Sequence, residues 1–122
     1  MDNDIAIKHR LKSVVERVMS LFVAKDYDAL VRLAGSARFT ERNIPEVAEV
    51  VSNYPADLVM PPESAYQGLM KVYEIENSSP RRWAIDMPFW TKPEGRSNLE
   101  MRVTITEDCG RLTVELDAVL VP

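Results

Sequence analysis

The chain has 122 residues, of which 46% are hydrophobic and 28% charged, a composition typical of one globular domain and not of a disordered tail or a fibrous repeat. Its 15 Lys and Arg residues against 19 Asp and Glu residues give a net charge of −4. An acidic chain disfavours non-specific binding to nucleic acid or to an anionic membrane, because both require a cationic surface. We therefore expect neither of these partners.

Metal and disulfide chemistry has few residues available. The chain holds one cysteine, Cys109, and one histidine, His9. A single thiol cannot close an internal disulfide, and zinc sites need three or four nitrogen or sulfur ligands. We expect no metal and no cofactor, and we read both residues as surface side chains. The N-terminus is acidic and no apolar run is long enough to cross a membrane, which predicts a cytoplasmic protein.

Helical periodicity marks the first half of the chain, about residues 3–55. Apolar residues recur at three- and four-residue intervals over residues 3–24, which predicts a long amphipathic helix. Asp26 is a candidate N-cap for a short second helix that ends near Gly35. A third helix is expected from residue 43 or 44 to residue 54. The apolar positions of the first helix are Ile5, Ile7, Leu11, Val14, Val15, Val18, Leu21 and Phe22.

The second half, about residues 70–121, alternates apolar and polar residues as half-buried antiparallel strands do. The sheet needs a cover and the helices need an apolar surface to pack on. We therefore expect a single α+β domain over residues 1–122, with three N-terminal helices packed on one face of a three- to four-stranded antiparallel meander. The expected strands are 83–90, 99–106 and 112–120, with a weaker one at 70–76, an extended piece at 58–60 and one helical turn at 63–69.

Pro88 interrupts the first clear strand and leaves two alternatives open. A proline cannot donate a hydrogen bond to a ladder, so it sits at edges or bulges. If a bulge lies there, Trp90 turns toward the core and Phe89 turns outward. If none does, Trp90 projects from the polar face of the sheet.

The stretch from Trp83 to Leu99 carries the most specific pattern of the chain, W-A-I-D, then F-W-T, then E-G-R-S-N-L. It resembles an uncharacterised family of small bacterial proteins whose hallmark reads W-x-V-D-x-x-L-W-T-x-E-E-G-R-S-D-L. The chain departs from this hallmark at Asn98, where Asp is usual, and at Pro93, where Glu is usual. The resemblance implies no established activity.

A weaker similarity concerns the NTF2-like cone fold. It is carried by the opening helix, by Lys25-Asp26-Tyr27 before the second helix, and by the C-terminal meander. It implies a pocket between the helices and the sheet, which would bind a small molecule.

Seven side chains are candidates for a binding surface. Four carboxylates and one arginine fall on the polar face of adjacent strands, and Trp90 and Arg96 flank a hairpin turn. Paired carboxylates can act as acid and base, but a solvated face with cross-strand ion pairs explains the same pattern. Trp and Arg dominate protein–protein hot spots. The seven are Asp86, Trp90, Arg96, Glu100, Arg102, Glu115 and Asp117.

No catalytic constellation is visible, so we predict a non-catalytic protein-binding domain. Its most concrete form is an immunity-type protein that binds and neutralises a basic toxin domain by charge complementarity. The alternative is an NTF2-like small-molecule-binding protein or enzyme. A third possibility is a homo-oligomer through the open sheet face or the edge strand near the C-terminus, because Val119 and Val121 are apolar residues on the otherwise polar face.

Overall fold

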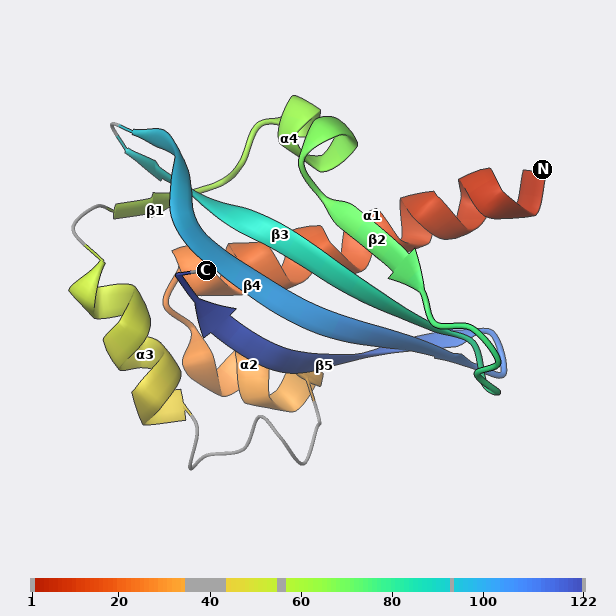
Figure 1. Cartoon of the computed structure of the whole chain (residues 1–122). Helices are drawn as coiled ribbons and strands as arrows, with labels where there is room; N and C mark the ends of the chain where they lie inside the picture. The colour runs from red at the N-terminus through yellow and green to blue at the C-terminus, as the bar shows by residue number, and fades with distance from the viewer. Residues whose placement is uncertain (1, 35–43, 55–56, 93, 122) are drawn as a thin grey trace.

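A computed structural model describes residues 2–34, 44–54, 57–92 and 94–121, which form helices and one antiparallel sheet (Figure 1). The long strands β3, β4 and β5 are neighbours in that order, and β3 also pairs with β1 at its C-terminal end and with β2 at its N-terminal end. The elements are α1 (Asp2–Val23), α2 (Tyr27–Ala34), α3 (Ile44–Asn53), β1 (Asp57–Val59), α4 (Glu63–Gly68), β2 (Lys71–Glu74), β3 (Arg82–Lys92), β4 (Gly95–Asp108) and β5 (Arg111–Leu120).

The mixed helix and sheet class is confirmed, and three details differ from the prediction. The sheet has five strands, since the short extended piece at residues 57–59 pairs with β3. The helical layer is dominated by α1, while α2 and α3 are only 8 and 10 residues long and lie beside β5. The strand predicted at residues 70–76 is shorter, because the chain turns at Asn77, which has a φ of 56°.

The junction between α1 and α2 is formed by backbone hydrogen bonds that follow directly from the sequence. Lys25 adopts a left-handed φ of 57°. Its N–H donates to the Phe22 carbonyl at 3.0 Å, and the Asp26 N–H donates to the Leu21 carbonyl at 2.9 Å, which is a Schellman ending. The Asp26 carboxylate then accepts the N–H of Ala29 at 3.2 Å, so the predicted N-cap is confirmed.

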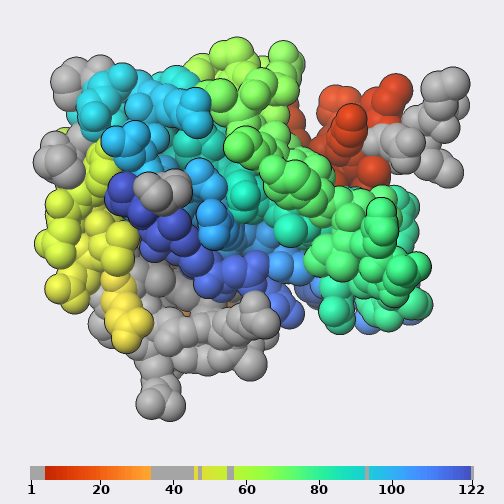
Figure 2. Space-filling model, in the orientation of Figure 1, coloured from red at the N-terminus to blue at the C-terminus, as the bar shows by residue number. Residues whose placement is uncertain are grey.

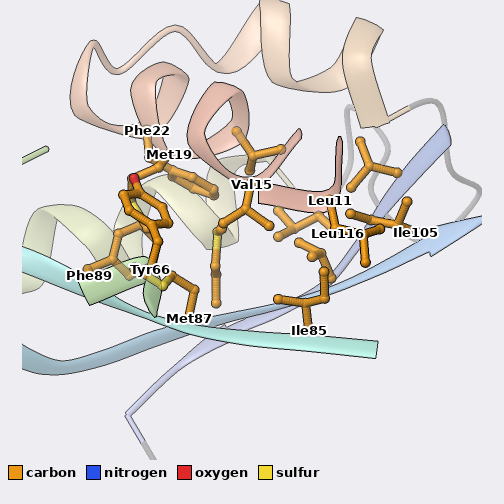
Figure 3. Close-up of a cluster of buried hydrophobic side chains, with 14 of the residues drawn as sticks. Leu11, Val15, Met19, Phe22, Tyr66, Ile85, Met87, Phe89, Ile105 and Leu116 are labelled. Atoms are coloured by element: carbon orange, nitrogen blue, oxygen red, sulfur yellow. The ribbon is translucent and has the colours of Figure 1, made fainter. Parts of the chain in front are cut away.

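The core forms where one apolar stripe of α1 meets alternate residues of β3 and β4 (Figure 3). The Phe22 and Phe89 rings meet edge to face, with centroids 5.1 Å apart. Ile5 departs from the predicted stripe, because its side chain is 60% exposed, and Met19 joins the stripe with none of its surface exposed. The other buried side chains labelled in Figure 3 are those of Leu11, Val15, Tyr66, Ile85, Met87, Ile105 and Leu116.

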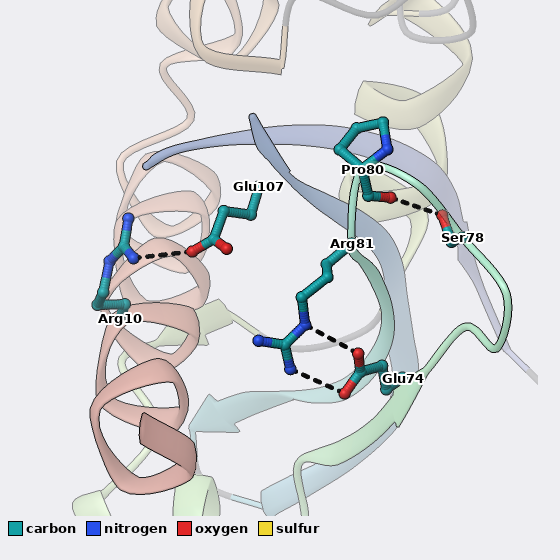
Figure 4. Close-up of polar contacts among 6 residues, drawn as sticks. All are labelled: Arg10, Glu74, Ser78, Pro80, Arg81 and Glu107. Carbon is teal, nitrogen blue, oxygen red and sulfur yellow. Dashed lines mark hydrogen bonds and ion pairs between the residues drawn. The ribbon is translucent and has the colours of Figure 1, made fainter. Parts of the chain in front are cut away.

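Two arginines form hydrogen bonds to residues at the ends of the strands (Figure 4). Arg10 of α1 donates to the Glu107 carboxylate at 3.0 Å and to the Gly110 carbonyl at 2.6 Å, which fixes the β4–β5 hairpin against the helix. Arg81 donates two hydrogen bonds to Glu74, at 2.9 and 3.0 Å, across the loop between β2 and β3. These bonds lower the pKa of the Glu74 carboxyl.

We expect Phe22→Ala to destabilise the fold by about 3–5 kcal/mol, because it removes a fully buried ring and leaves a cavity against Phe89. Urea denaturation followed by circular dichroism would measure this change. The control Val50→Ala, at a position 37% exposed on α3, should change stability by less than about 1 kcal/mol. Equal losses in the two variants would contradict the packing described above.

Candidate binding surface

The face of the sheet turned away from α1 carries all seven predicted site residues. In Figure 1 α1 passes behind the sheet, and in the same orientation Figure 2 shows the strands in front of a largely hidden α1. Buried and less buried residues alternate along β3 and β4, and the less buried ones lie on this side. We call it the open sheet face, defined by Asp86, Trp90, Arg96, Glu100, Arg102, Glu115 and Asp117.

Arg102 lies between two carboxylates near the centre of the open sheet face. Its Nε atom is 3.6 Å from Asp86 Oδ1 and 3.9 Å from Glu100 Oε1. Asp86 is directly opposite Arg102 in the ladder, and Lys71 of β2 is opposite Asp86 on its other side. Ion pairs this exposed contribute roughly 0–1 kcal/mol each, so they orient the side chains more than they stabilise the fold.

Asp117 occupies a one-residue bulge in β5. The ladder pairs Arg102 with Ala118 and Val103 with Leu116, so Asp117 is the one extra residue of β5 at this step. Its carboxylate accepts a hydrogen bond of 2.6 Å from the Thr104 hydroxyl. Glu115 is directly opposite the same Thr104, which brings the two carboxylates of β5 to one place.

This bulge overturns one sequence-based expectation. An odd number of extra residues reverses the alternation of a strand. Val119 is therefore paired with the buried Met101 and packs against the core, instead of lying on the polar face as predicted. Leu120 takes the outward position opposite Glu100, and Val121 beyond it is 57% exposed, as expected.

A second irregularity lies between β3 and β4. The ladder pairs Pro88 with Glu100 and Trp90 with Arg96, so residues 97–99 of β4 face Phe89 alone. Ser97 closes the gap, because its hydroxyl donates to the Phe89 carbonyl at 2.9 Å and accepts the Leu99 N–H at 3.1 Å.

The outcome for Trp90 matches neither alternative in full. A bulge is present, yet Phe89 stays fully buried and Trp90 keeps the outward position. The two extra residues on β4 are an even number, so the alternation is preserved. Trp90 is partly buried against the core, between Val59 of β1 and Arg96 of β4. Its indole also runs along Gly95, which has a φ of 83°.

A depression of about 480 Å³ opens beside this irregularity, and we call it the bulge depression. Two predicted residues, Arg96 and Glu100, lie on its walls. Sequence reasoning missed Ser97 and Asn98 as neighbours of the site, although the proline within a strand was a signal for it. The Asn98 N–H donates to the Tyr54 hydroxyl at 3.1 Å. The lining residues are Pro88, Arg96, Ser97, Asn98, Glu100 and Val121.

A separate groove of about 520 Å³ lies between α1, α4 and β2, and we call it the α1–α4 groove. Of its α1 residues, the sequence analysis placed Ile5 in the apolar stripe and His9 at the surface. Lys12 bridges the groove by an ion pair with Glu63 of α4, and its Nζ atom lies 5.9 Å from the centre of the Tyr66 ring. The lining residues are Ile5, Lys8, His9, Lys12, Glu63, Tyr66, Gln67, Met70 and Val72.

Tyr66 forms the boundary between this groove and the core. It is 5% exposed, and Figure 3 draws it among the buried side chains between α1 and the sheet. The hydroxyl is buried without a hydrogen-bond partner among the residues described. Burial, together with the negative charge of Glu16, raises the pKa of Tyr66 to about 12.

The described part of the chain has neither a metal-binding cluster nor a helix suited to cross a membrane. No group of three or more His, Cys, Asp or Glu side chains there could hold a metal ion. No helix in the same residues is long and apolar enough to cross a membrane.

The chain belongs to the family described as a domain of unknown function, DUF7668, whose model matches residues 19–122. The match covers all seven residues of the open sheet face and begins within α1. No curated protein and no solved structure matches the chain. The expectation of an uncharacterised family is therefore confirmed, and the similarity to NTF2-like folds stays a prediction.

We expect Ser97→Ala to destabilise the protein by about 1–3 kcal/mol, because the Phe89 carbonyl and the Leu99 N–H would both lose a partner in a buried place. Ser13→Ala is the matched control, since the Ser13 hydroxyl is exposed on α1 and bonds only the His9 carbonyl. Thermal or urea unfolding would measure both. A loss for Ser97→Ala no larger than that of the control would show that the bulge does not depend on this hydroxyl.

We also expect stability to fall as the pH rises from about 10 to about 12. The unfolded tyrosine loses its proton near pH 10, whereas folded Tyr66 keeps it until about pH 12. The unfolded state therefore binds fewer protons in this window, which lowers the free energy of unfolding. Tyr66→Phe should lose this part of the alkaline dependence, and Tyr73→Phe, at a position 54% exposed, should retain it. Identical pH profiles of unfolding for wild type and Tyr66→Phe would refute the assignment.

Proposed function

We propose that this protein is a non-catalytic binding domain that takes a protein partner on the open sheet face. The observation that carries the proposal is the gathering of a half-buried tryptophan, two exposed arginines and four carboxylates on the side of the sheet turned away from α1. Flat, mixed surfaces with an aromatic anchor and a charged surround are typical of protein interfaces.

Charge supports a basic partner. Of the seven residues of the open sheet face, four are acidic, and Arg102 is already engaged by two of those carboxylates. Lys71 adds one exposed cation beside Asp86. The chain as a whole carries −4. A complementary electrostatic potential accelerates the association of two proteins and disfavours partners whose charge has the same sign.

The end of the face near the β3–β4 hairpin supplies the anchor. Trp90 is held between β1 and β4, so little side-chain entropy remains to be lost when a partner covers it. The bulge depression lies alongside, with Arg96 and Glu100 on its walls and the exposed Val121 at its edge. A side chain of the partner that offers both apolar surface and a hydrogen-bonding end fits this lining.

The most concrete form of this proposal is an immunity-type protein of the cytoplasm that covers a basic toxin domain. An acidic surface on a small rigid sheet suits inhibition by occlusion, because it needs no conformational change. The family match names no activity, so this step rests on the charge and shape of the open sheet face.

The alternative, an NTF2-like protein with an interior pocket, has less support. The layer between α1 and the sheet is filled by side chains such as Met87 and Met101, neither of which exposes any surface. The groove of about 520 Å³ lies at the margin of that layer, against α4 and β2.

Affinity capture from the native host tests the proposal. We expect the tagged chain to retain one stoichiometric, basic protein at physiological salt. Glu100→Lys with Glu115→Lys should weaken that complex by roughly 100-fold, because like charges would then meet. Glu46→Lys with Glu49→Lys, on exposed positions of α3, changes the net charge equally and should leave affinity unchanged.

Two results would overturn the proposal: the absence of any stoichiometric partner, or a partner that survives the Glu100 and Glu115 reversals. The toxin version has its own readout. Expression of the captured partner alone should arrest growth of a test strain, and co-expression of this chain should restore growth. A chain that self-associates in light scattering and loses this association on the same reversals would instead favour the homo-oligomer.

A further inference from the structure

The α1–α4 groove has the size and the mixed lining of a small-molecule site. Its volume of about 520 Å³ falls within the roughly 300–1,000 Å³ common for ligand pockets. Two segments that are distant in sequence form its walls, residues 5–12 of α1 and residues 63–72, which include α4 and the start of β2. Figures 1 and 2 show the N-terminal half of α1 next to α4 and β2, away from the hairpin end of the sheet that carries Trp90.

One side of the groove is apolar. Met70 and Val72 are partly buried and pack against the core, and the Tyr66 ring lies between groove and core. Ile5 lines the groove with 60% of its surface exposed, because it lies on the same side of α1 as Lys8 and Lys12 and not in the buried stripe. An isoleucine left exposed beside a recess is apolar surface that a ligand can cover.

The other side is basic. Lys8, His9 and Lys12 come from consecutive turns of α1, against Glu63 on α4. Lys12 is engaged by Glu63 and lies 3.8 Å from Glu16. Lys8 and His9 have no side-chain hydrogen bond or ion pair with any other residue that the structure describes. The free cationic group of the groove is therefore Lys8, in a chain whose net charge is negative.

We propose that the α1–α4 groove binds a small amphipathic anion, a carboxylate joined to an apolar body of the kind found in a medium-chain fatty acid. The carboxylate pairs with Lys8 and accepts a hydrogen bond from His9, while the apolar body covers Ile5, Met70 and Val72. Charge-assisted hydrogen bonds supply orientation, and burial of the apolar body supplies affinity.

Other ligand classes fit the lining less well. Inorganic phosphate or a nucleotide phosphate would pair with Lys8 but leave the apolar wall in water. A neutral apolar ligand would cover Ile5 and Met70 but leave the lysine without a counter-charge. A cationic amphiphile would meet Lys8 as a like charge. The groove does not include residues of the open sheet face. The proposal of a ligand in the groove is therefore independent of whether a protein partner binds the open sheet face.

Octanoate below its micelle concentration is the probe for this proposal, observed by backbone amide shifts in NMR titrations of the full chain. We expect saturable shifts confined to the groove residues of α1, α4 and β2. Octylammonium, of matched length, should give no such shifts, and 1-octanol should bind at least about tenfold more weakly. Equal binding of octanoate and octanol would overturn the role of the charge.

Variants separate the site from general adsorption. Lys8→Glu and Ile5→Ser, both at exposed positions, should each weaken octanoate binding by about tenfold or more with an unchanged amide spectrum elsewhere. Arg17→Glu is the matched control, because Arg17 is exposed on the same helix outside the groove. Equal weakening by Arg17→Glu, or shifts spread over the surface, would overturn the site.

Vesicles of phosphatidylcholine and phosphatidylglycerol test the other source of an amphipathic anion. We expect the chain to stay in the supernatant when the vesicles are sedimented. If the protein sediments with the vesicles and Lys8→Glu abolishes this binding, the ligand of the groove is an anionic lipid surface, and the proposal of a free carboxylate is overturned.

Discussion

The burial of one apolar stripe of α1 against alternate residues of β3 and β4 is the constraint on which the other features depend. Because successive side chains of a strand point to opposite faces, burying Ile85 and Met87 under the helix places Asp86 on the far side. Each core side chain is worth several kcal/mol, whereas an exposed ion pair is worth about 1 kcal/mol or less. The acidic surface is therefore positioned by the core and not by attraction among its own charges.

Local patterns in the sequence predicted the elements that depend on local interactions. The length of α1, the Asp26 cap and the alternation of the three long strands are all readable over a few residues. The pairing of β1 with β3 was missed, because a strand of three residues has no measurable period and its partner lies some thirty residues further along the chain. The short helices α2 and α3 were expected in the same layer as α1, but packing beside β5 sets their place.

The candidate sites, like the fold, could be predicted only where they depend on local patterns in the sequence. The positions of Asp86, Glu100 and Arg102 follow from period two, so the sequence was sufficient to bring them together. The bulge at Asp117 was not foreseen, since no proline or glycine marks it, and so Val119 was assigned to the wrong face. The α1–α4 groove was missed because its walls come from two segments some fifty residues apart, which meet only in the folded chain.

The two irregularities of the sheet differ in parity, and this limits how the chain can vary in length. The two extra residues of β4 leave the faces of the strand unchanged, so removing both would shorten the hairpin and keep every side chain on its side. The single extra residue of β5 acts differently. If the ladder ran regularly through Asp117, Val119 would lie on the solvent side and Leu120 on the core side, so the bulge decides which side chain lies beside Glu100. Loss of two residues near Ser97 would therefore keep the faces of β4, and on β5 the core position of Val119 depends on Asp117 staying outside the regular ladder.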